Sequence, residues 1–216
     1  SDARPVALGA TPLDGLFDEL VCVVAAPAPP AAAAAAGAVA SLFVLGGGAA
    51  LPHSIARVDL TAAGELVGGV ARVVYTAGVP LDERFVSRPR RVAFETAPLE
   101  LAHPAPAAAA TTAHALLYRP ANARFAAPRG APPPPLLVKL HGGPTSGTSA
   151  IFRVDVQFWT SRGFAVLDVN YRGSVGFGRA YRELLTSPSP DGFGQWGIAD
   201  VEDACAGARA LVAAGD

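Results

Sequence analysis

The stretch LLVKLHGGP at residues 136–144 decides the fold of the sequence around it. Its first part, from Leu136 to Leu140, is a short, mainly apolar run of the kind that forms strands buried inside parallel sheets. Residues 141–144 follow at once and contain glycine and proline, which end regular structure. The sequence therefore predicts a buried strand that ends in a glycine-rich turn.

The residues after this turn predict a helix and a second buried strand. Ile151, Val154 and Phe158 recur at helical spacing, and the Arg-Gly pair at 162–163 supplies a cationic last turn and a C-cap. The next run, FAVLDV at 164–169, is again apolar. A strand, a helix and a strand in this order form a right-handed crossover between parallel strands. We therefore expect a sheet of the α/β type.

A second amphipathic helix is expected near residue 200. Acidic residues lie early in it and Arg209 lies late, as the helix dipole prefers, and Gly215 would end it. Asp200 and Asp203 could suggest an acid pair, but capping and dipole effects in the first turn explain them adequately. The apolar side chains expected on one face are those of Ile198, Val201, Cys205, Ala208 and Val212.

The first 90 residues indicate a series of antiparallel strands. Short β-prone runs lie between glycine, proline or polar residues at 20–24, 40–45, 55–60 and 70–75. Small residues between Thr61 and Glu65 suit a tight reversal, so hairpins are the expected pairing. Another pair of strands is expected at 91–97 and 113–118.

Two tracts rich in alanine and proline interrupt these strands, at 25–38 and 104–110. Their composition offers nothing specific to pack, so we expect surface loops. No charged residue lies between Val21 and His53, and that length could cross a membrane. Prolines and glycines interrupt the stretch, and alanine transfers only weakly into lipid, so we expect no membrane span.

The composition excludes several classes of protein. Hydrophobic residues make up 51% of the 216 and charged residues 16%, which is enough apolar material for a folded core. The net charge is -1 and few arginines are clustered, so the sequence offers no basic patch for nucleic acid. Cys22 and Cys205 match no metal-ligand spacing, so we expect no metal, and they favour a reducing, cytoplasmic compartment. Because methionine is absent, we expect the chain to be an internal piece of a longer protein.

Three blocks resemble consecutive motifs of the prolyl oligopeptidase family of serine peptidases. They are LVKLHGGPTS at 137–146, NYRGSVGFG at 170–178 and WGIADVED at 196–203, and the likeness is nearest to the acylaminoacyl-peptidase and dipeptidyl-peptidase-like branch. The resemblance implies that residues 1–90 are the last part of a β-propeller. It implies that residues 91–216 begin an α/β-hydrolase catalytic domain, which cleaves short peptides through an acyl-enzyme and needs no cofactor.

The glycine turn suits one task in such a reaction. The transition state of acyl transfer places negative charge on the former carbonyl oxygen, and backbone N–H donors must approach it closely. Glycine permits that approach, and the proline after it restricts the turn. By the resemblance, the amide of Gly143 is the donor. His141 would orient the turn or contact the substrate region, but the favoured interpretation is a structural histidine that satisfies a backbone group. Arg172 is a weaker candidate for a substrate contact.

No catalytic triad can be assigned within the chain. The expected Gly-x-Ser-x-Gly elbow is not matched by residues 147–151 or by residues 172–176. In the family, nucleophile, acid and histidine all follow the helix that we expect to end at Gly215, so the four histidines of the chain come too early. We therefore expect the isolated chain to be inactive.

Two other functions stay open at this point. A carboxylesterase or lipase also has a glycine-rich oxyanion loop after a strand. A family member without a nucleophile could keep the fold as a binding module. The residue at the centre of the downstream elbow would separate catalysis from binding.

Overall fold

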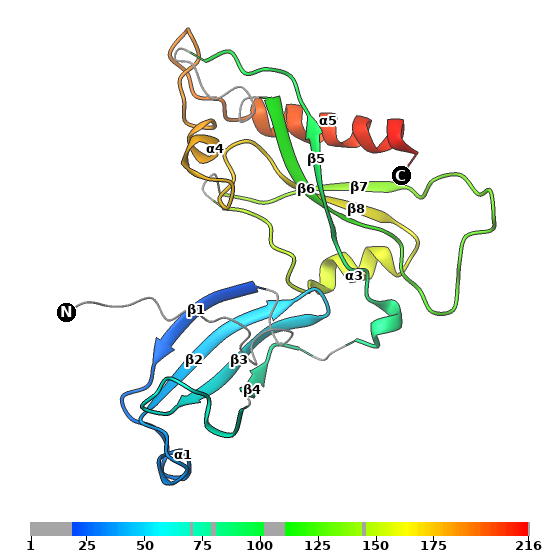
Figure 1. Cartoon of the computed structure of the whole chain (residues 1–216). Helices are drawn as coiled ribbons and strands as arrows, with labels where there is room; N and C mark the ends of the chain where they lie inside the picture. The colour runs from blue at the N-terminus through cyan, green and yellow to red at the C-terminus, as the bar shows by residue number, and fades with distance from the viewer. Residues whose placement is uncertain (1–18, 70, 79–80, 102–110, 144–145, 216) are drawn as a thin grey trace. The chain divides into compact units, whose positions relative to one another are not determined.

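The computed structural model describes residues 19–69, 71–78, 81–101, 111–143 and 146–215 (Figure 1). The chain folds as two units. The first extends to Leu81 and includes Ala150–Arg153, and the second contains Asp82–Ser149 and the residues from Val154 onward. The division that the sequence suggested, at residue 90, falls at the start of a strand in the second unit. Residues 104–110, expected to form a loop, lie outside the described residues.

The first unit is built on a four-stranded antiparallel sheet. Its strands follow one another in space as they do in sequence, which confirms the expected hairpins. At the predicted reversal, the Thr61 amide donates to the Glu65 carbonyl over 2.8 Å. The elements are β1 (Glu19–Ala25), α1 (Ala31–Ala35), β2 (Ala40–Gly48), β3 (Leu51–Leu60), the short 3-10 helix η1 (Val67–Gly69) and β4 (Arg72–Thr76).

The alanine-rich tract at 25–38 differs from the surface loop that the sequence predicted. It contains α1, and Ala33 and Ala38 are buried, so only part of it is an exposed loop. Alanine has the highest helix propensity, and Pro30 stands at the N-cap, where its missing N–H costs nothing. A composition without specific packing groups therefore still forms a short helix.

Residues 150–153 pack on the first sheet instead of starting a helix. The Phe152 amide donates to the Gly48 carbonyl over 2.8 Å. Ile151 is 2% exposed, and its Cγ2 lies only 2.7 Å from where a Cβ on Gly47 would stand. Gly47 therefore admits the side chain that anchors this segment, and the expected helix begins three residues later, at Val154.

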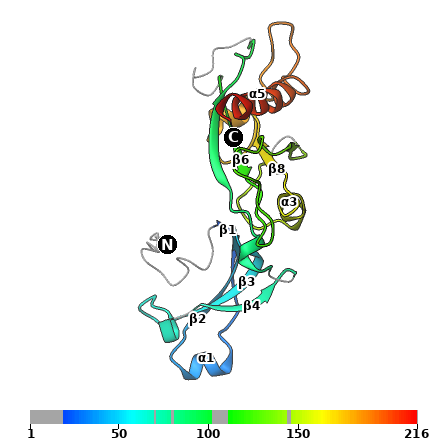
Figure 2. The same cartoon turned by 90° about the vertical axis from the view of Figure 1, so that its right-hand side faces the viewer.

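The second unit holds a mixed sheet in the order β5-β6-β8-β7 (Figures 1 and 2). β6 runs antiparallel to both of its neighbours, whereas β7 and β8 are parallel. This confirms the expected α/β sheet and its parallel pair. β8 is buried along its whole length, as a central strand should be. The strands are β5 (Arg90–Glu95), β6 (Thr112–Tyr118), β7 (Leu136–Leu140) and β8 (Ala165–Asn170).

Helices cover both faces of this sheet (Figure 2). On one face α5 packs on Phe94, Leu117 and Leu167, which form the main core with Ala206 and Leu211 of the helix. On the other face α3 lies against β8, and Lys139 of β7 pairs with Asp155 of α3 over 3.2 Å. The helices are η2 (Glu83–Phe85), α3 (Val154–Thr160), α4 (Arg179–Glu183) and α5 (Ala199–Ala214), and Gly215 caps α5 with φ 71°, as predicted.

The buried faces of the two helices differ from the predicted ones. In α3 the buried residues are Val156, Gln157 and Thr160, while Val154 and Phe158 are exposed. Gln157 is buried because its amide mimics a peptide group: it accepts from the Ser87 amide over 2.7 Å and donates to the Ser87 carbonyl over 3.2 Å.

In α5 the predicted apolar stripe is largely exposed, and small residues form the packed face. A Cβ on Gly207 would stand 2.9 Å from both Leu167 and Phe94, so the helix approaches the sheet where a side chain is missing. The four exposed members of the predicted stripe are Ile198, Val201, Cys205 and Val212.

Candidate functional site

The carboxyl ends of β7 and β8 bring two turns together. Because these strands are parallel, the turn at 141–143 and the turn from Tyr171 onward emerge at the same edge of the sheet. Ligands of α/β sheets bind outside the carboxyl ends of the strands. This edge is therefore where the sequence and the topology both place a candidate site.

Gly143 lies in the first of these turns with its backbone exposed. Its φ is +66°, and a Cβ built on it would meet nothing within 4 Å. Among the residues that the structure describes, none accepts a hydrogen bond from its amide. The expectation for Pro144 falls outside the described residues. Gly143 thus has the left-handed backbone that glycine tolerates, with open space around it.

His141 fastens this turn to the turn after β8. Its Nε2 lies 2.7 Å from Ser174 Oγ, and the Ser174 hydroxyl donates to the Tyr171 carbonyl over 2.7 Å. Nε2 then carries the proton. The Tyr171 hydroxyl donates to the His141 carbonyl over 3.2 Å and also lies 3.3 Å from Nδ1. The His141 and Tyr171 rings also stack, with centroids 4.3 Å apart. We define these three residues as the His141 contact group.

Burial sets the protonation of this group. It lowers the pKa of His141, against the opposing effect of the Gly142 carbonyl and Asp168. It raises the pKa of the Tyr171 phenol. The neutral imidazole and the protonated phenol are therefore favoured, which is the state that the hydrogen bonds require.

The short Ser174–His141 contact is not a nucleophile and its base. Ser174 is fully buried, and its hydroxyl already donates to a carbonyl. A nucleophile must reach a substrate carbon and give its proton to the base. The contact therefore holds two turns together. His141 Nδ1 also lies 3.4 Å from the Gly142 carbonyl, so the ring contacts both side chains and the backbone.

A second layer of polar side chains fixes the segment after the glycine turn. The Asn170 side chain accepts from the Thr148 amide over 2.7 Å and donates to the Thr148 carbonyl over 3.1 Å. The Thr148 hydroxyl donates to Asp168 over 2.7 Å, and Lys139 Nζ lies 3.4 Å from the same carboxylate oxygen. The loop between β7 and α3 is thus held to β8 by side chains that point out of the sheet.

Arg172 does not have the environment expected of a substrate-binding residue. Its side chain has no exposed surface and forms an ion pair of 2.7 Å with Asp203, which is equally enclosed. The geometry gives no support to a substrate contact by Arg172. It also corrects the view of Asp203 as a residue explained by capping, because Asp203 is the buried partner of Arg172.

Sequence reasoning missed Tyr171, Ser174 and Asp203 as parts of this arrangement. Their contacts join residues about 30 positions apart, which no local pattern reveals; the Ser174–His141 contact, for example, spans 33 positions. The one available signal was that all three lie inside the blocks at 170–178 and 196–203 that carry the family resemblance.

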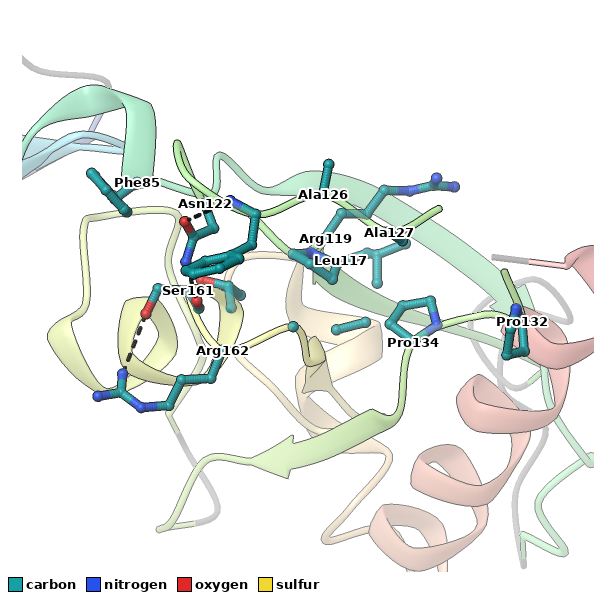
Figure 3. A pocket seen from close by; sticks show the side chains of 15 residues that line it. Phe85, Leu117, Arg119, Asn122, Ala126, Ala127, Pro132, Pro134, Ser161 and Arg162 are labelled. Atoms are coloured by element: carbon teal, nitrogen blue, oxygen red, sulfur yellow. Dashed lines mark hydrogen bonds between the residues drawn. The ribbon is translucent and has the colours of Figure 1, made fainter. Parts of the chain in front are cut away.

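A large hollow of the second unit lies at the opposite edge of the sheet (Figure 3). It has a volume of about 1110 Å³ and lies beside Ala165, where β8 begins, and beside Leu117, next to the last residue of β6. Prolines, alanines and Phe125 dominate its lining. Polar contacts also occur along it, such as the bond of 2.7 Å from the Asn122 amide to the Ser161 carbonyl. We call this hollow the proline groove.

A smaller hollow of about 180 Å³ lies beside the carboxyl end of β8. His114 forms one wall and stacks on Phe177, with ring centroids 4.2 Å apart. Burial lowers the pKa of His114. Asn170 lines the same hollow, so it lies next to the polar layer that holds the loop after β7.

Neither a metal centre nor a membrane span is found in the described part of the chain. No three ligand-type side chains of the described residues come together as a metal would require. No helix among the same residues has the length and apolarity needed to cross a bilayer.

Comparison with known proteins points to one family. Residues 150–215 match the Prolyl oligopeptidase family. Dipeptidyl aminopeptidase BIII of Pseudoxanthomonas mexicana is 39% identical over 64 residues, which is 30% of this chain and 8% of that protein. Acylamino-acid-releasing enzyme 1 of Oryza sativa subsp. japonica is 37% identical over 67 residues, 31% of this chain and 8% of that protein.

Solved structures extend the likeness over most of the chain. A puromycin-hydrolyzing peptidase of Mycobacterium tuberculosis matches 81% of this chain with 37% identity and a TM-score of 0.65. The match covers 23% of that structure's chain. The present chain therefore spans about a quarter of the structural relative and less than a tenth of the two curated relatives.

Proposed function

We propose that the chain is part of a serine peptidase, because residues 150–215 match the Prolyl oligopeptidase family. The complete protein hydrolyses short peptides through an acyl-enzyme, and the amide of Gly143 is one of its two oxyanion donors. The single observation that carries this proposal is the exposed amide of Gly143. This amide donates no hydrogen bond to any described residue and lies at the carboxyl edge of β7.

The order of the elements supports an α/β-hydrolase domain. In that fold one oxyanion donor comes from the loop between the third strand and the first helix. β7 is the third strand of its sheet along the chain, and α3 is the first helix after it. Gly143 stands in the loop between these two elements. Its place in the topology therefore agrees with the role that the family resemblance implies.

The chemistry needs a rigid donor. Negative charge develops on the carbonyl oxygen as the tetrahedral intermediate forms, and a preorganised N–H at hydrogen-bond distance lowers the barrier by about 3 kcal/mol. The His141 contact group supplies the rigidity, because it fixes the turn from both sides through Tyr171 and Ser174. His141 is in this proposal a positioning residue.

The remaining catalytic groups are proposed to lie in other parts of the complete protein. They are a serine in a Gly-x-Ser-x-Gly elbow, an acid and a histidine, in that order along the chain. The second oxyanion donor is the amide after the serine. The 216-residue chain on its own should then hydrolyse nothing.

We propose that the first sheet is the last part of a β-propeller. Propeller blades are four-stranded antiparallel sheets whose strands follow one another in sequence, as β1 to β4 do. Exposed apolar side chains on the edge strand β1, Leu20, Val21, Val23 and Val24, suit a blade with neighbours. By the family resemblance, the propeller restricts access to short, flexible peptides.

The test uses the complete protein expressed from its full reading frame. We expect it to release p-nitroaniline from short peptide p-nitroanilides and to be labelled on one serine by a fluorophosphonate. Hydrolysis of fatty-acyl p-nitrophenyl esters without cleavage of peptides would favour the esterase alternative. A protein that is neither labelled nor active would instead be the binding module.

A further inference from the structure

A buried ion pair lies directly behind the His141 contact group. Arg172 stands between Tyr171 and Ser174 in the sequence, and its partner is Asp203 of α5. Neither side chain has any exposed surface. Arg172 Nη2 and Nε lie 2.7 and 2.9 Å from Asp203 Oδ1. Two guanidinium nitrogens thus converge on one carboxylate in a charge-assisted contact.

The same carboxylate binds the backbone of the turn. The Arg172 amide donates to Asp203 Oδ2 over 2.7 Å. On its other side, Arg172 Nη1 donates to the Ala97 carbonyl over 2.7 Å, and the Thr96 hydroxyl donates to Asp203 Oδ1 over 2.7 Å. The residues after β5, the turn after β8 and the first half of α5 are therefore joined at one point.

Stability alone does not explain a buried pair of this kind. Removing each ion from water costs several kcal/mol, so apolar side chains of similar volume often stabilise a fold as well or better. Apolar side chains cannot, however, bond the Arg172 amide or the Ala97 carbonyl. The charged pair therefore contributes direction: it fixes where the backbone of the turn lies.

Gly173, which follows Arg172, restricts the backbone path of the turn. Gly173 has a φ of +113°, and a Cβ on it would stand 2.4 Å from the Cβ of Leu185. The Arg172 amide is bonded on one side of this glycine, and on the other side the Ser174 amide donates to the Tyr171 carbonyl over 2.9 Å. The position of Ser174 Oγ opposite His141 follows from this fixed path.

We propose that the Arg172–Asp203 pair positions the turn after β8 so that Tyr171 and Ser174 hold His141, and the pair thereby aims the Gly143 amide at the reacting carbonyl. This inference rests on the proposed function, because it assigns the pair a task in that reaction. Arg172 is then a positioning residue that touches no substrate.

The experiment compares double variants of the complete protein. Arg172→Met with Asp203→Leu replaces the pair by apolar side chains. Its melting temperature should fall only moderately, because the apolar pair avoids the cost of burying two charges but leaves the Arg172 amide and the Ala97 carbonyl without their partners. Its kcat for a peptide p-nitroanilide should fall about 100-fold, because a misplacement of 1 Å in a catalytic arrangement has that effect. Its KM should change little.

A matched control removes an exposed ion pair from the same unit. Arg179 Nε lies 2.6 Å from Glu183 in α4, and both side chains are at least half exposed. Arg179→Gln with Glu183→Gln should leave kcat and KM unchanged. If the apolar double variant fails to fold, Arg172→Lys takes its place: it keeps the buried charge pair but loses the planar fork that reaches Asp203 and the Ala97 carbonyl together, and kcat should again fall.

A second measurement separates positioning from a general loss of structure. A peptide aldehyde forms a tetrahedral adduct that carries an oxyanion, whereas the product peptide does not. Affinity for the aldehyde should fall in parallel with kcat, and affinity for the product peptide should stay. Equal losses of both affinities would overturn the inference.

The two proposals fail in different ways. An active wild-type protein whose apolar double variant keeps full kcat would overturn the role of the pair and leave the peptidase proposal intact. A wild-type protein that neither hydrolyses peptides nor binds the aldehyde would overturn the peptidase proposal, and the role of the pair with it.

Discussion

The two edges of the second sheet differ in the polarity and bonding of the side chains that line them. At the carboxyl edge of β7 and β8, fully buried polar groups bond one another and leave a small exposed glycine turn. At the other edge, the proline groove is roomy and mainly apolar, although polar groups such as Asn122 and Ser161 also bond there. If size alone identified a site, the groove would be chosen.

The contrast shows that the density of polar contacts identifies a functional site better than the size of a cavity does. A buried polar group costs free energy unless it is bonded, so a cluster of satisfied ones at one edge records a requirement for fixed geometry. The groove carries no such requirement. Substitutions at the two edges should therefore differ in their effects on stability and catalysis.

The largest effect is expected from a methyl group at Gly173. Gly173→Ala would place a Cβ 2.4 Å from that of Leu185 at a φ of +113°, so overpacking and backbone strain should cost about 3 kcal/mol of unfolding free energy. Gly130, near the groove, has a φ of +81° and open space around it. Chemical denaturation of the two alanine variants should show a clearly smaller loss for Gly130→Ala.

A change at Gly143 should act on the reaction more than on the fold. Gly143→Ala strains a φ of +66° and turns the amide, so kcat of the complete protein should fall about 100-fold, as when an oxyanion donor is removed. Gly130→Ala is the control, since it bears the same kind of strain at the other edge. Equal kcat values for the two variants would contradict the role of Gly143.

A smaller effect is expected from pH. Burial lowers the pKa of His141 and of His114, so the native protein holds both neutral while the unfolded chain binds protons near pH 6.5. Because the unfolded chain then binds more protons, stability is complete above pH 6.5 and is lost as the pH falls below it. Melting temperatures across this range should vary less in His141→Asn and His114→Asn. An unchanged slope in both variants would contradict the assignment.

The smallest effect is expected at the proline groove. Phe125 is 77% exposed, so Phe125→Ala removes little buried surface and should leave kcat, KM and melting temperature close to wild type. Activity assays and thermal unfolding of the complete protein check this. A marked fall in kcat would show that the groove takes part in the reaction, and would contradict the view that only the carboxyl edge does.

The strands could be predicted because each is a short apolar run between turn residues, as at Leu136–Leu140. The buried faces of the helices could not. Periodicity located an apolar stripe on α5, but packing selected the small residues around Gly207, because Phe94 and Leu167 come closer than a side chain would allow.

The candidate site divides in the same way. The glycine turn was visible because its residue types are rare together and sit at the end of a strand. The partners of His141 and the Arg172–Asp203 pair were not visible, since each contact depends on how distant segments meet. An aspartate in a first helical turn looks the same in sequence whether it caps the helix or pairs with a buried arginine.

The placement of residues 150–153 has a mechanical consequence. The backbone passes from one unit to the other after Leu81, returns after Ser149 and leaves again after Arg153. Ile151 and Phe152 are embedded in the first unit, so the loop that begins at the glycine turn is tethered there. A protease that cut only after Leu81 would therefore nick the chain without removing the contacts that residues 150–153 make within the first unit.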